Sequence, residues 1–157
     1  MAADQRRVDR HTAHKALIAP IRAALYDYDA AALHRALSAA LAPDAVVRLA
    51  NPLGEMVGVS AFIDTAFAPL AAAMPDFERR DTIVVAGDTP EGEDWVGTCG
   101  AYVGTFVRPW LDIAPTGHVA SVRFHEFYRV VEGAVCEIQA LWDVPAVMMQ
   151  AGAWPMA

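Results

Sequence analysis

Four long runs rich in β-branched and aromatic residues fill the second half of this 157-residue chain, and they constrain its fold more than any other feature. The runs cover residues 77–86, 95–107, 118–131 and 134–143. Short turn-forming segments separate them, among them residues 87–90 and 132–133. Because a parallel crossover needs about a dozen or more residues, these short connections predict antiparallel pairing of the long strands.

Helical patterns precede the strands. Residues 9–41 carry apolar side chains at spacings of three and four, which predicts two amphipathic helices with a break just before Asp29, the cap of the second. A β-prone run covers residues 45–50, and a third helix is predicted over 60–73 with Ser60 as its cap. Helices followed by antiparallel strands predict an α+β fold, in which N-terminal helices pack on a curved antiparallel sheet.

The length of the chain fits a single domain over residues 1–157, since typical domains contain about 100 to 150 residues. Residues 1–10 are polar, are expected to be flexible and lack the features of a secretory signal, so a cytoplasmic protein is expected. The apolar segment 144–157 is expected to close one end of the sheet or to lie at a subunit interface. We expect a homodimer, the commonest assembly of soluble homo-oligomers.

Composition argues against two classes of partner. The formal net charge of −7 disfavours nucleic acid, because phosphate binding requires clustered Lys and Arg side chains. The pairs Arg6–Arg7 and Arg79–Arg80 are interpreted as solvated surface. Although 55% of the residues are hydrophobic, no uninterrupted apolar run reaches about 18 residues, so no segment is expected to span a bilayer and no membrane partner is expected.

The run 118–131 contains the strongest candidate for chemistry. Alternate side chains of a strand point to opposite faces, and the even-numbered positions of this run are mostly apolar, with Glu126 in their middle between Phe124 and Tyr128. A carboxylate in such surroundings must be paired, be protonated or face a wet cavity. Two interpretations follow: a catalytic acid/base whose pKa an apolar pocket raises toward neutrality, or a buried carboxylate that an Arg or a Tyr hydroxyl holds for structure alone.

The preceding run contains small residues over 97–104, which either remove volume at the wall of a cavity or mark bulges and bends. If there is a cavity, candidate residues around it would offer polar groups, aromatic surfaces or a second acid. These candidate substrate-binding residues are Asn51, Tyr102, Trp110, His118, Glu137 and Asp143.

No metal site is expected. His118 and His125 are seven residues apart on one predicted strand, which directs the two imidazoles to opposite faces, whereas metal sites need three or four converging ligands. Cys99 and Cys136 both lie inside strand-like runs and are interpreted as buried thiols rather than as a disulfide or a zinc site.

Several short pieces, in this order and spacing, resemble the SnoaL-like polyketide cyclases, a family with the nuclear-transport-factor-2-like fold. The pieces are residues 51–54 with Gly58, 74–76 with Arg79–Arg80, 100–104, 114–117, 123–127, Gly133 with Glu137 and Asp143, and 150–152. The resemblance implies helices that close one end of a curved antiparallel sheet around an apolar pocket, and a mechanism without a cofactor. It also implies that the position of Glu126 holds the acid/base of an intramolecular aldol closure; the characterised cyclases have Asp there.

The leading hypothesis is therefore a cofactor-free acid/base enzyme, of the cyclase or isomerase type, that acts on a small carbonyl-bearing aromatic or polyketide-like molecule through Glu126. The alternative is a non-catalytic binding protein for a small apolar or aromatic molecule. A third hypothesis is a structural subunit that associates through its Met- and Trp-rich tail.

Overall fold

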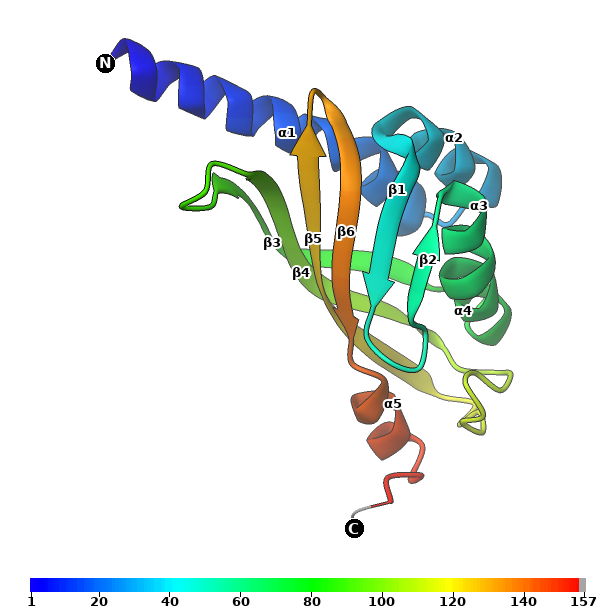
Figure 1. The fold of residues 1–157 in the computed structure, drawn as a ribbon. Coiled ribbons are helices and arrows are strands. Elements are labelled where there is room, and N and C mark those ends of the chain that lie inside the picture. The colour runs from blue at the N-terminus through cyan, green and yellow to red at the C-terminus, as the bar shows by residue number, and fades with distance from the viewer. Residues whose placement is uncertain (156–157) are drawn as a thin grey trace.

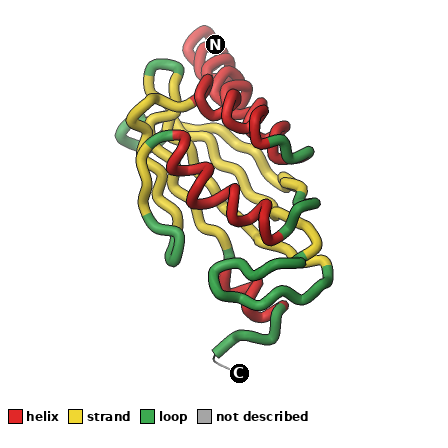
Figure 2. Tube along the Cα trace, turned by 90° about the vertical axis from the view of Figure 1, so that its right-hand side faces the viewer, coloured by secondary structure: helices red, strands yellow, loops and turns green. Residues whose placement is uncertain are grey.

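The computed structural model describes residues 1–155 and has two layers, a curved six-stranded sheet and a set of helices that lie across one of its faces (Figures 1 and 2). The elements are α1 (Ala2–Tyr26), α2 (Ala30–Ala40), β1 (Leu41–Leu49), β2 (Glu55–Val57), α3 (Val59–Phe62), the π-helical segment η1 (Ile63–Phe67), α4 (Ala68–Ala73), β3 (Glu78–Asp88), β4 (Asp94–Thr105), β5 (Val119–Val131), β6 (Ala134–Trp142) and α5 (Val144–Gln150). The predicted α+β fold, with N-terminal helices on a curved sheet, is confirmed.

The sheet has the order β2-β1-β6-β5-β4-β3. The four long strands β3 to β6 pair antiparallel. Short turns join β3 to β4 and β5 to β6, as predicted, whereas residues 106–118 join β4 to β5. The sheet as a whole is mixed, however, because β1 pairs with β6 in parallel. The prediction of a wholly antiparallel sheet was wrong at this point, since most of the chain separates β1 from β6 and no hairpin dictates their direction. The three-residue strand β2 was not predicted.

The break between the first two helices lies where the sequence predicts it. The Asp29 carboxylate accepts a hydrogen bond from the Ala32 backbone N–H at 2.6 Å and so caps α2. The third helical stretch begins one residue earlier than predicted, and Ser60 does not cap it. Gly58, with a φ of 82°, precedes Val59 and occupies the cap position. Residues 2–10, which were predicted to be flexible, form the first turns of helix α1.

The C-terminal helix α5 packs against β5 at one end of the sheet (Figure 1). Val144 and Val147 are buried there, and the Gln150 side chain exchanges two hydrogen bonds of 2.9 Å with the Ser121 backbone. Met156, part of the predicted tail, lies outside the described residues. Within residues 1–155, no helix is long and apolar enough to span a membrane.

The glycines of β4 allow close approach of neighbouring backbone. A Cβ atom on Gly100 would lie 2.0 Å from the Arg80 carbonyl oxygen, beside the irregularity in the pairing of β3 between Asp81 and Ile83. A Cβ atom on Gly104 would lie 2.9 Å from the Phe77 Cα atom. The interpretation of these glycines as marks of bulges and bends therefore fits the structure better than a cavity wall does.

Candidate functional site

Glu126 lies on the inner face of β5, the face that the helices cover. The even-numbered residues of β5 from Ala120 to Val130 are buried, whereas their odd-numbered neighbours are exposed or half-buried. This confirms the predicted alternation. β5 lies between β6 and β4 in the sheet, and Glu126 is directed into the interior and is 2% exposed.

The residues that face Glu126 on the neighbouring strands are small. Thr98 of β4 and Ala140 of β6 are its direct partners in the ladder. Small side chains at these two positions leave space through which longer side chains from more distant positions reach the carboxylate. Three of the groups that do so come from β3, β4 and β6, and the fourth follows two residues later on β5.

Four donors occupy the two oxygens of the carboxylate. Oε1 accepts hydrogen bonds from the Tyr102 hydroxyl at 2.8 Å and from Trp142 Nε1 at 2.9 Å. Oε2 accepts from Arg79 Nη1 at 2.7 Å and from the Tyr128 hydroxyl at 2.6 Å. A carboxylate has about four lone-pair sites, so Glu126 is fully hydrogen-bonded.

Arg79 connects this site to the rest of the interior. It is 1% exposed, and its guanidinium also donates to Thr98 Oγ1 at 2.9 Å and to the Asp81 carboxylate at 3.0 Å. The same guanidinium lies over the Phe124 ring, 4.1 Å from its centroid. Arg79 therefore serves as a counter-ion for Glu126 and is held in place by neighbours on each side.

An aromatic shell surrounds the polar groups. The Tyr102 ring contacts Phe77, Phe124 and Trp142, with centroid distances of 5.7, 4.9 and 4.9 Å. The Phe67 ring of η1 contacts Trp142 from the helical layer at 5.4 Å. These side chains form an aromatic shell beside Glu126 on the inner face of the sheet.

The pKa of Glu126 is lowered. Burial raises the pKa of this carboxyl, but the Arg79 charge and the hydrogen bonds from Tyr128, Arg79 and Tyr102 lower it by more. Burial and the Glu126 charge raise the pKa of both tyrosines well above the usual range. The direction of this shift is opposite to the rise toward neutrality expected from an apolar pocket, because the pairing favours the ionised carboxylate.

The interpretation of Arg79–Arg80 as solvated surface was half wrong. Adjacent residues of a strand point to opposite faces, so Arg80 is exposed while Arg79 is directed inward. A buried Glu126 was expected to need an Arg or a Tyr hydroxyl as its partner, and Arg79 is that Arg, although the sequence did not identify it. Tyr128 and Trp142, the other two contributors not proposed as site residues, lie on the same inner face.

Of the six candidate substrate-binding residues, the structure brings Tyr102 to Glu126. Asn51 and His118 are exposed in connections, and Trp110 is buried with an indole N–H that has no partner within the described residues. Glu137 lies on the outer face of the sheet in ion pairs with Arg48 and Arg129. Asp143 caps α5, accepting from the Ala146 N–H at 3.0 Å, and pairs with Arg123.

One group of potential metal ligands joins α1 to the turn between β3 and β4. His11, Asp88 and Asp94 bring three ligand-type atoms within 4.8 Å of one another. The Arg10 Nε atom lies 3.1 Å from Asp94 Oδ1. A guanidinium therefore already provides the positive charge beside these carboxylates, and the group is an ion-pair cluster that holds the helix to the hairpin. The thiols of Cys99 and Cys136 are free and half-buried.

Comparison with known proteins identifies the fold and the family. The model of the family described as SnoaL-like polyketide cyclase matches residues 23–151. AclR of Streptomyces galilaeus, a proposed hydroxylase, has a TM-score of 0.74 at 21% identity, covering 94% of this chain and 85% of its own. IdmH of Streptomyces antibioticus, a proposed polyketide cyclase, has a TM-score of 0.71 at 20% identity, covering 88% and 98%.

TsrD of Streptomyces laurentii has a TM-score of 0.68 at 22% identity, covering 90% of this chain and 96% of its own. No curated protein sequence matches the chain. At such identities these likenesses establish the fold alone. AclR and IdmH are described by different activities on the same architecture, so the fold does not select the reaction.

Proposed function

Since this chain belongs to the SnoaL-like polyketide cyclase family, we propose that it is a proton-transfer enzyme that acts on a small carbonyl-bearing aromatic or polyketide-like molecule without a cofactor. Glu126 is the acid/base. The observation that carries the proposal is a buried Glu126 carboxyl group, surrounded by two phenol groups and a guanidinium, inside an otherwise apolar interior. Natural sequences break the rule of apolar cores most often at functional sites.

In the proposed reaction, Glu126 takes the proton from the carbon next to a carbonyl group, and the C–H electron pair becomes an enolate. Tyr128 and Arg79 are positioned to stabilise the enolate oxygen, because they already donate to a negative oxygen. The enolate carbon then forms a bond to a second carbonyl carbon of the same molecule. The resulting alkoxide takes the proton back from Glu126, so the cyclised product is an isomer of the substrate.

Substrate contact with Glu126 requires that one of its four donors moves away. The side of Arg79 is the favoured entry, because Arg79 also lines a hollow of about 720 Å³ between α1 and β3. Arg22, Tyr26 and Asp81 lie around the same hollow, and the Arg22 side chain pairs with Asp81 at 2.9 Å. In this proposal a shift of α1 away from β3 opens the path.

A second candidate function is non-catalytic binding of a small apolar or aromatic molecule. It is favoured by the complete occupation of the Glu126 oxygens and by the lowered pKa, which makes the carboxylate a weak base. In this case the polar cluster stabilises the fold, and any ligand binds elsewhere on the molecule.

Deuterium exchange separates the two functions without knowledge of the natural substrate. 1-Acetonaphthone, a flat aromatic ketone, is incubated with the protein in D₂O, and exchange of its methyl protons is followed by NMR. The enzyme proposal predicts exchange above the buffer rate, a loss of about 10²- to 10⁴-fold in Glu126→Gln, and recovery in Glu126→Asp, which restores a carboxylate. The exposed-site variant Glu55→Gln serves as the control and retains the wild-type rate.

Fold must be checked in parallel, because Glu126→Gln leaves Arg79 without its counter-ion. Circular dichroism and a thermal shift with the same ketone provide that check. Binding of the ketone without any exchange by the wild-type protein contradicts the enzyme and supports the binding protein. Equal exchange by the wild-type protein and by folded Glu126→Gln contradicts the role of Glu126.

A further inference from the structure

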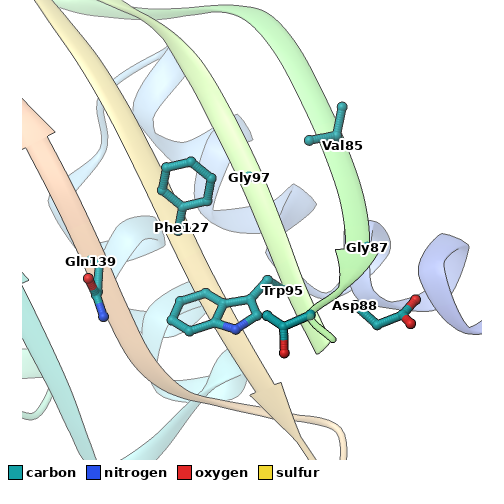
Figure 3. A pocket seen from close by; sticks show the side chains of 8 residues that line it. Val85, Gly87, Asp88, Trp95, Gly97, Phe127 and Gln139 are labelled. Carbon is teal, nitrogen blue, oxygen red and sulfur yellow. The ribbon is translucent and has the colours of Figure 1, made fainter. Parts of the chain in front are cut away.

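Two of the hollows in this protein have walls of different chemistry. The hollow on the outer face of the sheet, between Val85, Trp95 and Phe127, is lined mainly by apolar surface (Figure 3). The hollow of about 720 Å³ between α1 and β3, which we call the α1–β3 hollow, has three arginines and one aspartate in its wall. Small-molecule sites have volumes of about 300 to 1,000 Å³, so this hollow has the size of a ligand site. Its lining residues are Ala19, Arg22, Ala23, Tyr26, Arg79, Arg80 and Asp81.

One face of α1 brings a cation and an aromatic ring to the α1–β3 hollow. Ala19, Arg22, Ala23 and Tyr26 are spaced by three and four residues, so their side chains lie on the same side of the helix. The two alanines leave space beside the longer side chains. Tyr26 is 61% exposed, so its ring is accessible to a ligand. This face can therefore hold a flat aromatic molecule beside a guanidinium.

Arg22 has hydrogen-bonding capacity that the protein does not use. Its Nε atom donates to Asp81 Oδ2 at 2.9 Å. Within residues 1–155, neither of its Nη atoms has a hydrogen-bond partner. A guanidinium carries N–H donors on all of its nitrogens, so those on Nη1 and Nη2 remain available to a ligand. Such a pair of parallel donors matches the two oxygens of a carboxylate.

The other arginines of the α1–β3 hollow are already occupied. Arg79 is buried and donates to Glu126 Oε2 at 2.7 Å. The Nε and Nη2 atoms of Arg80 both donate to Glu78 Oε2, at 3.1 and 2.9 Å. Arg22 is therefore the arginine of this hollow that a ligand can engage.

Ion pairs connect Arg22 to the proposed acid/base. Asp81 accepts from Arg22 at 2.9 Å and from Arg79 Nε at 3.0 Å. Together with Glu126, these side chains form a row of alternating charge that begins in the interior and ends at Arg22, whose side chain is 29% exposed. A negative group on Arg22 would extend the alternation by one member, because opposite charges at hydrogen-bond distance attract each other. The end of the row therefore favours an anionic ligand group.

We propose that the α1–β3 hollow binds a carboxylate group of the substrate through Arg22, so that the substrate is an aromatic or polyketide-like carboxylic acid. This inference rests on the proposed function, because it names the substrate class for the path that leads to Glu126. One available guanidinium matches one carboxylate, whereas the net charge of −7 disfavours a more highly charged anion. Arg22 is a specificity-determining residue and takes no part in the proton transfer.

Binding of 1-naphthoic acid and of 1-naphthamide at neutral pH tests the proposal, because the two molecules have nearly the same shape but only the acid is charged. Isothermal titration calorimetry gives both dissociation constants. The wild-type protein is expected to bind the acid about 10-fold or more tightly than the amide. Arg22→Gln should weaken binding of the acid by about 10-fold or more and leave binding of the amide unchanged.

Arg35→Gln is the matched control, because Arg35 is an exposed arginine of the neighbouring helix α2 and does not line the α1–β3 hollow. It should bind both molecules like the wild type. Arg22→Gln is expected to retain the wild-type circular dichroism spectrum, since Asp81 keeps Arg79 as its counter-ion.

NMR of the same titration locates the bound acid. The backbone amide signals of Ala19 and Ala23 are expected to shift, whereas the indole N–H signal of Trp95, which lines the outer hollow, is not. Shifts at Trp95 without shifts at the two alanines place the acid in the outer hollow and overturn the proposal.

Three results of the calorimetry also overturn the proposal: equal affinity for acid and amide, no binding of the acid at millimolar concentration, or equal acid binding by the wild type and folded Arg22→Gln. None of them depends on turnover, so the test is separate from that of the reaction. Acid binding through Arg22 without exchange of 1-acetonaphthone contradicts the reaction alone. Exchange that depends on Glu126, without a preference for the acid, contradicts the carboxylate site alone.

Discussion

Arg79 Nη1 lies 2.7 Å from Glu126 Oε2, and both side chains are almost completely buried. The two residues come from β3 and β5, two strands that do not touch, and β4 between them contributes Thr98 and Tyr102 to the same cluster. The cluster therefore ties three strands together on the inner face. Each hydrogen-bonding partner contributes to the stability of this buried ion pair. Substitution of one partner at a time therefore tests the cluster.

Removal of the cation should destabilise the protein strongly. Arg79→Met leaves the Glu126 carboxylate buried without its counter-ion, which costs about 3 to 5 kcal/mol of unfolding free energy. Arg80→Met is the control: the adjacent side chain is 64% exposed and should change stability by less than about 1 kcal/mol. Urea unfolding measures both. A similar, small loss in the two variants would contradict the pairing.

Stability should depend on pH through Glu126 in a defined direction. The pKa of Glu126 is lowered in the folded protein from its ordinary value of 4.5, so the unfolded chain binds this proton more readily. The stabilisation by the ionised group is present above pH 4.5 and is lost as the pH falls from 4.5 through the lowered folded pKa. Accordingly, the difference in unfolding free energy between the wild type and Glu126→Gln should shrink with acid over that range. A difference that grows as the pH falls would refute the direction of the shift.

Loss of one phenol should weaken the cluster and raise the Glu126 pKa. Tyr128→Phe removes the 2.6 Å hydrogen bond to Oε2, and hydrogen bonds to charged groups contribute about 1.5 to 3 kcal/mol. The acid-unfolding midpoint of this variant should therefore move to higher pH. Tyr26→Phe provides the comparison, since Tyr26 is 61% exposed, and it should unfold like the wild type.

Substitution of Gly100 in β4 tests how closely the backbone of β3 approaches it. Gly100→Ala would place a Cβ atom 2.0 Å from the Arg80 carbonyl oxygen, and backbone cannot yield cheaply there, so a loss of about 1 to 3 kcal/mol or more is expected. Gly87→Ala, in the same sheet with nothing within 4 Å of the added atom, is the control and should be neutral within about 0.5 kcal/mol. Thermal unfolding of the two variants makes the comparison, and equal melting temperatures would argue against the close approach.

Asp143, which caps α5, contributes both a capping hydrogen bond and a charge, and two substitutions can separate these contributions to stability. Asp143 accepts from the Ala146 N–H and also pairs with Arg123. Asp143→Asn keeps a good capping side chain and loses only an exposed ion pair, so it should cost less than about 1 kcal/mol, whereas Asp143→Ala also loses the cap and should cost about 0.5 to 2 kcal/mol more. Urea unfolding distinguishes them. Equal losses would show that the cap contributes nothing.

Much of the fold follows from local patterns in the sequence. The alternation over 118–131 is sufficient to place Glu126 on a buried face, and short turns fix the antiparallel pairing of β3 with β4 and of β5 with β6. The parallel pairing of β1 with β6 was not predictable in the same way, because it joins segments that are distant in the chain and have no turn between them.

The candidate site was less predictable, because its partners come from four strands. Period-two alternation on β3 could have shown that Arg79 and Arg80 face opposite sides, but not which of the two is buried. The meeting of Trp142 with Glu126 depends on the small residue Ala140 opposite Glu126, a consequence of register that no single strand reveals. The direction of the Glu126 pKa shift depends on these partners and could not be inferred from apolar neighbours alone.

The ionisation state of Glu126 in the folded protein is the most direct test of this account, since the proposed reaction and the stability of the cluster both begin from a carboxylate. Carbon-13 NMR of the glutamate side-chain carboxyl groups, with the Glu126 signal assigned by its absence in Glu126→Gln, measures that state as a function of pH. We predict an ionised group at neutral pH whose titration midpoint lies below the ordinary value of 4.5. A Glu126 carboxyl that is protonated at neutral pH would contradict the account.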